Sequence, residues 1–170
     1  MEPYWKSYVY AALFLAIAIV VQSLRLIFPM IPGPVNMFLI GSLVNAILVA
    51  AVCVTQRGWT AAIGLFLPLV AFLQGHLPAA PLIPVVGIGN ALFAFLVWRL
   101  WSRRVVWLAA FFKAGFLYGG TLLVISFLGL PDKLAVLLSF MMGWPQIVTG
   151  CLGIFIARLL LQRIRTQKNI

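Results

Sequence analysis

Acidic residues are almost absent from this chain of 170 residues, which contains one glutamate, Glu2, and one aspartate, Asp132. Proton- or sodium-coupled transporters generally use carboxylates inside the membrane, or unwound helices rich in oxygen ligands. Neither acid lies in a hydrophobic segment, so we do not expect ion-coupled transport. The sequence also lacks the motifs GxxxxGK[ST], GxSxG and HExxH, and it offers no intramembrane aspartate pair. These absences argue against ATP hydrolysis and against proteolysis by this chain. We therefore expect that the chain is not an enzyme.

Cysteine and histidine are nearly as scarce. Cys53 and Cys151 fall in separate hydrophobic segments and form no CxxC pair, which disfavours thiol redox chemistry. His76 is the single histidine and has no carboxylate or thiolate beside it in sequence, so it makes a poor metal site. We therefore expect no metal and no cofactor.

Apolar residues, by contrast, make up 65% of the chain, while charged residues make up 8%. A soluble domain of this size could not bury so much apolar surface, which predicts an all-α integral membrane protein. The net charge of +10 lies at helix ends rather than on one basic face, which indicates contacts with lipid headgroups and not with nucleic acid. All residues, 1–170, can belong to a single transmembrane domain.

Proline, glycine and charged residues divide the chain into six hydrophobic stretches, each near the length that crosses a bilayer. We place these spans at about 8–28, 35–55, 59–76, 81–101, 105–129 and 135–161. The third is the shortest and contains Pro68. The sixth contains Gly143-Trp144-Pro145, which should bend or locally unwind the helix.

Lysine and arginine are distributed unequally between the two sides of this six-helix bundle. One side has nine: Lys6, Arg57, Arg99, Arg103, Arg104, Arg158, Arg163, Arg165 and Lys168. The other side has Arg25 and Lys133. The positive-inside rule then predicts that both termini are cytoplasmic. Five tryptophans (Trp5, Trp59, Trp98, Trp101 and Trp107) fall at the same interface, as an aromatic belt would.

Lys113 lies near the middle of the fifth span, and no acid in the chain can reach it. A lysine at this depth costs about 2.5–3.5 kcal/mol on insertion scales, so its partner must be neutral or must come from outside the chain. Other polar side chains gather in the outer halves of the spans and predict an outward-facing cavity with an apolar floor. The candidate binding residues are Lys113, Asn90, Gln146, Trp144, Tyr118, Asn45, Gln74, His76, Gln22, Arg25 and Asn36. For any single amide, the alternative role is a hydrogen bond between helices. Lys113 could be satisfied by amides or carbonyls, and Arg25 could extend to lipid headgroups.

Two further patterns concern loops and close helix contacts. Segment 28–34 contains three prolines and is expected to be stiff, either as a connector or as a lid over the cavity. Ala12-x-x-x-Ala16 and Gly115-x-x-x-Gly119 have the spacing that lets helices approach closely, and packing within the bundle is the first expectation for both.

With its size, its six predicted spans and its predicted cytoplasmic termini, the chain resembles an S component of an energy-coupling factor (ECF) transporter. The resemblance also includes the Ala12-x-x-x-Ala16 face, the proline-rich first outer loop and a last helix entered through Trp144-Pro145-Gln146. This resemblance implies a subunit of the bacterial cell membrane that captures a small nutrient, a vitamin or its precursor. It also implies that Ala12 and Ala16 dock on a transmembrane coupling subunit served by two cytosolic ATPases. The implied pocket residues are Asn90, Lys113, Tyr118, Trp144 and Gln146, and segment 29–34 would be the gate.

Two other classes of protein have a similar size. A membrane scaffold of the rod-shape-determining type would use the polar residues for packing and would bind no small molecule. A protein similar to the tryptophan-rich sensory proteins would bind a tetrapyrrole or a sterol. That class is suggested by the six tryptophans but weakened by the position of five of them at one interface. A co-purified ligand, or its absence, would distinguish the three classes.

Overall fold

The computed structural model describes residues 4–28, 30–55 and 57–167, and all the regular structure in these ranges is helical. Seven α-helices and one 3-10 helix follow in order: α1 (Tyr4–Ile27), α2 (Gly33–Val54), α3 (Arg57–Leu73), α4 (Leu82–Leu100), η1 (Arg104–Trp107), α5 (Leu108–Leu128), α6 (Asp132–Met142) and α7 (Trp144–Gln167). Glu2, Pro29 and Lys168, which the sequence analysis used, lie outside the described residues.

Five stretches are long and apolar enough to cross a membrane. They are Trp5–Ile27, Gly33–Val54, Leu82–Leu100, Arg104–Leu128 and Asp132–Ile164. Helix α3 is also apolar but has 17 residues, which correspond to about 25 Å at the rise of an α-helix and fall short of a full hydrocarbon core. The prediction of an all-helical chain is therefore confirmed for the described residues, and five stretches, rather than the predicted six, are long and apolar enough to span a membrane.

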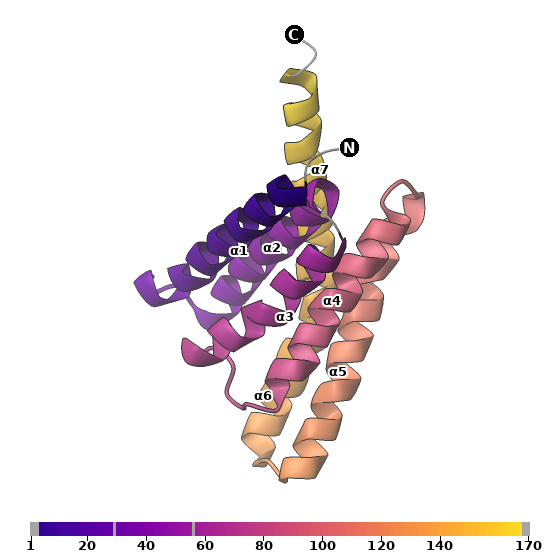
Figure 1. Cartoon of the computed structure of the whole chain (residues 1–170). Helices are drawn as coiled ribbons and strands as arrows, with labels where there is room; N and C mark the ends of the chain where they lie inside the picture. Colours follow the sequence, from indigo (N-terminus) through magenta and orange to yellow (C-terminus); the bar gives the residue numbers. More distant parts are fainter. Residues whose placement is uncertain (1–3, 29, 56, 168–170) are drawn as a thin grey trace.

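The helices run back and forth, so that the start of α1 and the end of α7 lie at the same end of the bundle (Figure 1). We call this the terminal end, and the opposite end, with the loops after α1, α3 and α5, the distal end. Helix α7 packs most extensively against α2, and α4 packs against α3 and α5. Helix α1 packs against α2 and α3 at one side of the bundle.

Three breaks in the helices have clear local causes. The bend predicted in the sixth stretch is present, because Gly143 has a non-helical backbone (φ −92°, ψ −129°) that ends α6 and lets α7 begin at Trp144. Helix α3 ends at Leu73, earlier than predicted, since Gly75 has a positive φ of 72° and starts the loop that carries His76. Helix α2 begins at Gly33, so the loop before it is shorter than the predicted segment 28–34.

Close helix contacts set the geometry of the bundle centre. A Cβ atom on Gly153 of α7 would lie 2.5 Å from the Cβ of Asn45 and 2.9 Å from the backbone N of Ala46, so α2 and α7 touch nearly backbone to backbone. By contrast, Gly115 and Gly119 have nothing within 4 Å of such an atom. The expectation that these two glycines pack within the bundle is wrong, because they lie on the outward face of α5.

The terminal end is closely packed. We call its buried residues the terminal-end cluster, and they come from α2, α4, η1, α5 and α7: Val49, Phe93, Val97, Val106, Ala109, Ala110, Ile154 and Ala157. Each is fully shielded from solvent. This cluster forms the apolar floor on which the polar distal half rests.

Candidate functional site

A cavity of about 130 Å³ lies in the distal half of the bundle, among side chains from every α-helix and from the loop after α3. Its polar lining residues are Gln22, Arg25, Asn45, His76, Asn90, Lys113, Gln146 and Thr149. Its apolar lining residues are Met37, Gly41, Val44, Leu67, Pro68, Ala71, Leu77, Val86, Met141 and Met142. No carboxylate is among these lining residues. The predicted polar cavity with an apolar floor is therefore present.

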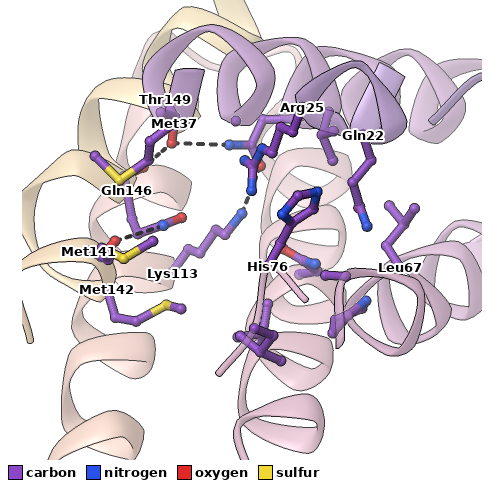
Figure 2. A pocket seen from close by; sticks show the side chains of 18 residues that line it. Gln22, Arg25, Met37, Leu67, His76, Lys113, Met141, Met142, Gln146 and Thr149 are labelled. Atoms are coloured by element: carbon purple, nitrogen blue, oxygen red, sulfur yellow. Dashed lines mark hydrogen bonds between the residues drawn. The ribbon is translucent and has the colours of Figure 1, made fainter. Parts of the chain in front are cut away.

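Lys113 lies at the bottom of this cavity and is 3% exposed. Its Nζ atom donates a 2.7 Å hydrogen bond to Oδ1 of Asn45 and lies 5.0 Å from the centre of the Phe93 ring. Asn45 in turn donates through Nδ2 to Oγ1 of Thr149 at 3.3 Å, and this hydroxyl donates to the backbone oxygen of Gln146 at 3.3 Å. The neutral partner that the sequence required for Lys113 is thus an amide, held by a chain of hydrogen bonds that joins α5, α2 and α7 (Figure 2).

Two other amides at the cavity donate to backbone carbonyls that have no donor within their own helix. Proline has no N–H, so the carbonyl four residues before it in a helix loses its usual donor. Pro68 leaves Gly64 in this state, and Nδ2 of Asn90 donates to the Gly64 oxygen at 3.3 Å.

Met141 lies in the last turn of α6, where carbonyls have no donor within the helix, and its oxygen receives a 2.9 Å bond from Nε2 of Gln146. The donor groups of Asn90 and Gln146 therefore have structural partners. The alternative that these amides serve helix contacts applies to this part of both side chains.

Arg25 and His76 line the distal part of the cavity. The Nε atom of Arg25 and the Nε2 atom of His76 are buried, and neither has a hydrogen-bond partner. His76 lies in the loop after α3, outside the apolar stretches, and its pKa is lowered by burial and by the nearby charge of Arg25. Figure 2 shows the side chains of Arg25, His76 and Lys113 directed toward a common space. The cavity therefore gathers three basic groups from three different parts of the chain.

Gln22, Ser23 and Gln74 form a short hydrogen-bond network beside the cavity. Nε2 of Gln22 donates to Oε1 of Gln74 at 3.2 Å, and Nε2 of Gln74 donates to Oγ of Ser23 at 2.8 Å. This network ties the distal end of α1 to the end of α3. Gln22 lines the cavity, whereas Gln74 lies outside its lining.

Four predicted binding residues are not part of the cavity lining: Gln74, described above, and Tyr118, Trp144 and Asn36. Tyr118 is 44% exposed and Trp144 is 54% exposed, so neither supplies an aromatic wall to the cavity. Each α-helical residue turns by about 100°, so Tyr118, five positions after Lys113, faces well away from it, and Trp144 faces opposite to Gln146. Trp144 instead packs against Phe38 and Phe140, with ring centres 5.6 and 5.7 Å away. Asn36, in the first turn of α2, also lies outside the lining.

The segment predicted as a gate contributes nothing to the cavity in its described part. None of residues 30–34 lines the cavity, and Met30 is 95% exposed. Ala12 and Ala16 are both exposed on α1, on the surface of the bundle. The expectation of packing within the bundle is therefore wrong for these alanines too, and their face of α1 is open.

Three methionines of the cavity, Met37, Met141 and Met142, were not predicted from the sequence. Met37 had a signal, because it lies eight positions before Asn45 on the same side of α2. Met141 and Met142 lie on α6, before the break at Gly143, so helical spacing does not relate them to the polar residues of α7. In a chain this apolar, an apolar residue can be predicted to line a cavity only when it shares a helix face with polar residues.

The arrangement can hold a small polar molecule but offers few of the groups that catalysis needs. The cavity has many donors, no carboxylate and no nucleophile paired with a base, so binding is the chemistry that it supports best. Comparisons of the chain with protein-family models, with curated proteins and with solved structures gave no match.

Proposed function

We propose that this chain is the substrate-capturing membrane subunit of an ECF-type importer in the bacterial cell membrane. It binds a small water-soluble nutrient, a vitamin or a vitamin precursor, in the distal cavity. The observation that carries this proposal is the cavity itself: an acid-free, donor-rich space in the half of the bundle away from both termini. A binding site without an energy source of its own suits a subunit that depends on partners for transport.

The proposed topology has six membrane crossings, with α3 as a short third crossing and α6 and α7 together as the sixth. Both termini are cytoplasmic, and the cavity opens toward the outside. The unequal numbers of lysine and arginine on the two sides support this orientation. The start of α1 and the end of α7 lie at the same end of the bundle, as an even number of crossings would place them, and this supports the same topology.

The exposed face of α1 supports the proposed partners, a transmembrane coupling subunit and two cytosolic ATPases. Ala12 and Ala16 lie four positions apart on this face, and small side chains let a second helix approach closely. Asp132, the acidic residue of the described chain, is the first residue of α6 and does not line the cavity, so coupling to ATP hydrolysis in a partner fits better than coupling to an ion gradient.

The cavity also bears on the two alternative classes. A scaffold has no use for a space lined by buried donors without partners, because closer packing would be more stable. A tetrapyrrole is larger than a 130 Å³ space, since pockets for drug-sized ligands start near 300 Å³. The larger groove on α4 and α5 beside Gly115 and Gly119 has a purely apolar lining. It offers no polar group to orient such a ligand.

Native mass spectrometry of the gently purified protein tests the proposal. We expect a co-purified small polar metabolite, and its loss on exchange into fresh detergent. A co-purified tetrapyrrole would favour the sensor class, and no ligand at all would favour the scaffold.

Docking can be tested by co-purification of the coupling subunit from the native host. Ala12→Trp and Ala16→Trp should abolish co-purification while the metabolite stays bound. Ala62→Trp is the control, because Ala62 is equally exposed but lies on α3. Co-purification that survives both α1 substitutions would contradict the proposed docking face.

A further inference from the structure

Two basic side chains enter the cavity from helices that are not in contact with each other. Arg25 comes from the last turn of α1 and Lys113 from the middle of α5. Within the described residues, α1 packs against α2 and α3, and it does not pack against α5. No contact between α1 and α5 therefore spans the space between the two side chains, although both side chains point into it (Figure 2).

Beside the amide oxygens of Gln22, Asn90 and Gln146, this space contains buried donors without partners. Arg25 Nε is buried without a partner, and an arginine presents five N–H groups in a planar fork. The Lys113 ammonium can donate three hydrogen bonds, and Asn45 Oδ1 is its single side-chain acceptor among the described residues. The lining holds no carboxylate to balance either charge. Buried charges are normally paired, so the missing partner is an anion.

We propose that the cavity binds the carboxylate of a compact organic anion between Arg25 and Lys113, and that the bound anion links α1 to α5. The inference rests on the proposed function, because it names the substrate class of the same capture site. A carboxylate suits this pair, since an arginine fork can hold both of its oxygens while a lysine binds one as a point charge.

The size and the remaining walls of the cavity define the rest of this anion. A space of about 130 Å³ is less than half of the smallest pockets that hold drug-sized ligands, so the molecule is compact. Met37, Met141 and Met142 line the cavity, and their flexible side chains give an adaptable apolar surface. One charged end and one small apolar body therefore match the two kinds of wall.

The test is thermal unfolding of the full chain in nanodiscs with a series of carboxylates from formate to benzoate, each beside its uncharged amide. We expect millimolar carboxylates to raise the Tm, with benzoate above formate, and the amides to leave it unchanged. Lys113→Met and Arg25→Gln should each weaken the response to benzoate by about tenfold or more, as loss of one charged hydrogen bond does. Arg25→Lys should retain part of it. The control variants Lys133→Met and Arg99→Gln remove exposed charges outside the cavity and should respond as the wild type does.

Hydrogen exchange tests the link between the helices. Benzoate should slow exchange at the end of α1 in the wild type and not in Lys113→Met, although Lys113 lies on another helix. The inference is overturned if benzamide stabilises as well as benzoate, if no carboxylate stabilises the wild type, or if both cavity variants keep the full response. The benzoate–benzamide contrast needs no variant, so it holds even where a substitution prevents folding.

These outcomes are separable from those of the proposed function. A neutral metabolite found by native mass spectrometry, together with binding of the coupling subunit, would leave nutrient capture intact and refute the anion. A carboxylate response in a protein that never binds a coupling subunit would support the anion and refute the importer.

Discussion

The terminal-end cluster and the cavity meet at Phe93 and Lys113 and are built in opposite ways. On the terminal side, the eight residues of the terminal-end cluster are fully buried and entirely apolar. On the distal side, the same helices α2, α4, α5 and α7 turn polar side chains toward a cavity. The change occurs within one turn of α5, because Ala109 and Ala110 belong to the cluster and Lys113 belongs to the cavity.

This difference separates what the fold needs from what the site needs. Buried polar networks that are only partly satisfied are less stable than an apolar core, and the distal half contains buried donors without partners. The terminal-end cluster is packed with apolar side chains alone. The buried polar groups around the cavity depart from that solution, as the proposed binding function would require.

The largest loss of stability is expected from Phe93→Ala, at the floor of the cavity. The deletion opens a void in the terminal-end cluster, and we expect a cost of about 3 kcal/mol, the lower end of the range for such deletions, because lipid rather than water surrounds unfolded helices. Thermal unfolding in nanodiscs measures it. Phe111→Ala makes the same deletion on an outward face of α5, where Phe111 is 52% exposed, and should cost far less. Equal losses in the two variants would mean that the cluster has no special role.

A smaller loss is expected where α2 and α7 touch. In Gly153→Ala the new methyl group would lie 2.5 Å from Cβ of Asn45, and the helices would have to separate at a cost of about 2 kcal/mol. The variant should also weaken benzoate binding, because Asn45 positions Lys113. Gly115→Ala, with nothing within 4 Å, is the matched control and should be neutral in both measurements.

The next prediction concerns the hydrogen bond between Lys113 and Asn45. Asn45→Leu leaves the Lys113 ammonium without its acceptor, and we expect a loss of about 1.5 kcal/mol, near the upper end measured for hydrogen bonds in membranes. Lys113→Met removes the charge itself and should change stability little. The double variant should then be more stable than Asn45→Leu alone, which a double-mutant cycle of unfolding temperatures would reveal. A double variant as unstable as the sum of both would show that Asn45 acts independently of Lys113.

The sequence predicted the class of fold and much of the cavity for physical reasons. Long apolar runs define membrane helices, and Gly143 with Pro145 cannot continue a regular helix, so the bend followed directly. Gln22, Asn45 and Lys113 were found because polar groups in apolar helices must face inward. End points were less predictable: α3 stops at a glycine with positive φ, which hydropathy does not register.

The errors came from using depth along a span without the angle around its axis. Trp144 and Tyr118 lie at the depth of the cavity but on outward faces, and Gly115 has the spacing of a packing motif on a face that nothing covers. Asn90 donates to a carbonyl freed by Pro68 on α3, and Gln146 donates to a carbonyl at the end of α6. Which side chain meets which carbonyl depends on the register between neighbouring helices, and a single sequence does not specify that register.

The smallest expected effect concerns pH and would sharpen the contrast between the halves, because the terminal-end cluster contains no titrating group. The pKa of His76 in the empty protein lies below its ordinary value of 6.5, owing to burial and to Arg25. Arg25 and Lys113 are the charged groups that face His76 in the cavity, and both oppose its protonation. A bound carboxylate adds a negative charge, so it should raise the pKa of His76.

Binding should then take up protons, and by linkage the affinity for benzoate should rise a few-fold as the pH falls through the pKa of the complex. Below the pKa of the empty protein the affinity should level off. The stability of the empty protein should move in the opposite direction, because a histidine with a lowered pKa disfavours the folded state once the pH falls below about 6.5. Titration calorimetry in buffers of different ionisation enthalpy measures the protons taken up, and His76→Gln should abolish this uptake while leaving benzoate bound. Proton uptake that persists in His76→Gln would assign the proton to another group of the cavity. If the wild type takes up no proton, His76 lies too far from the anion for the charge of the anion to change its pKa.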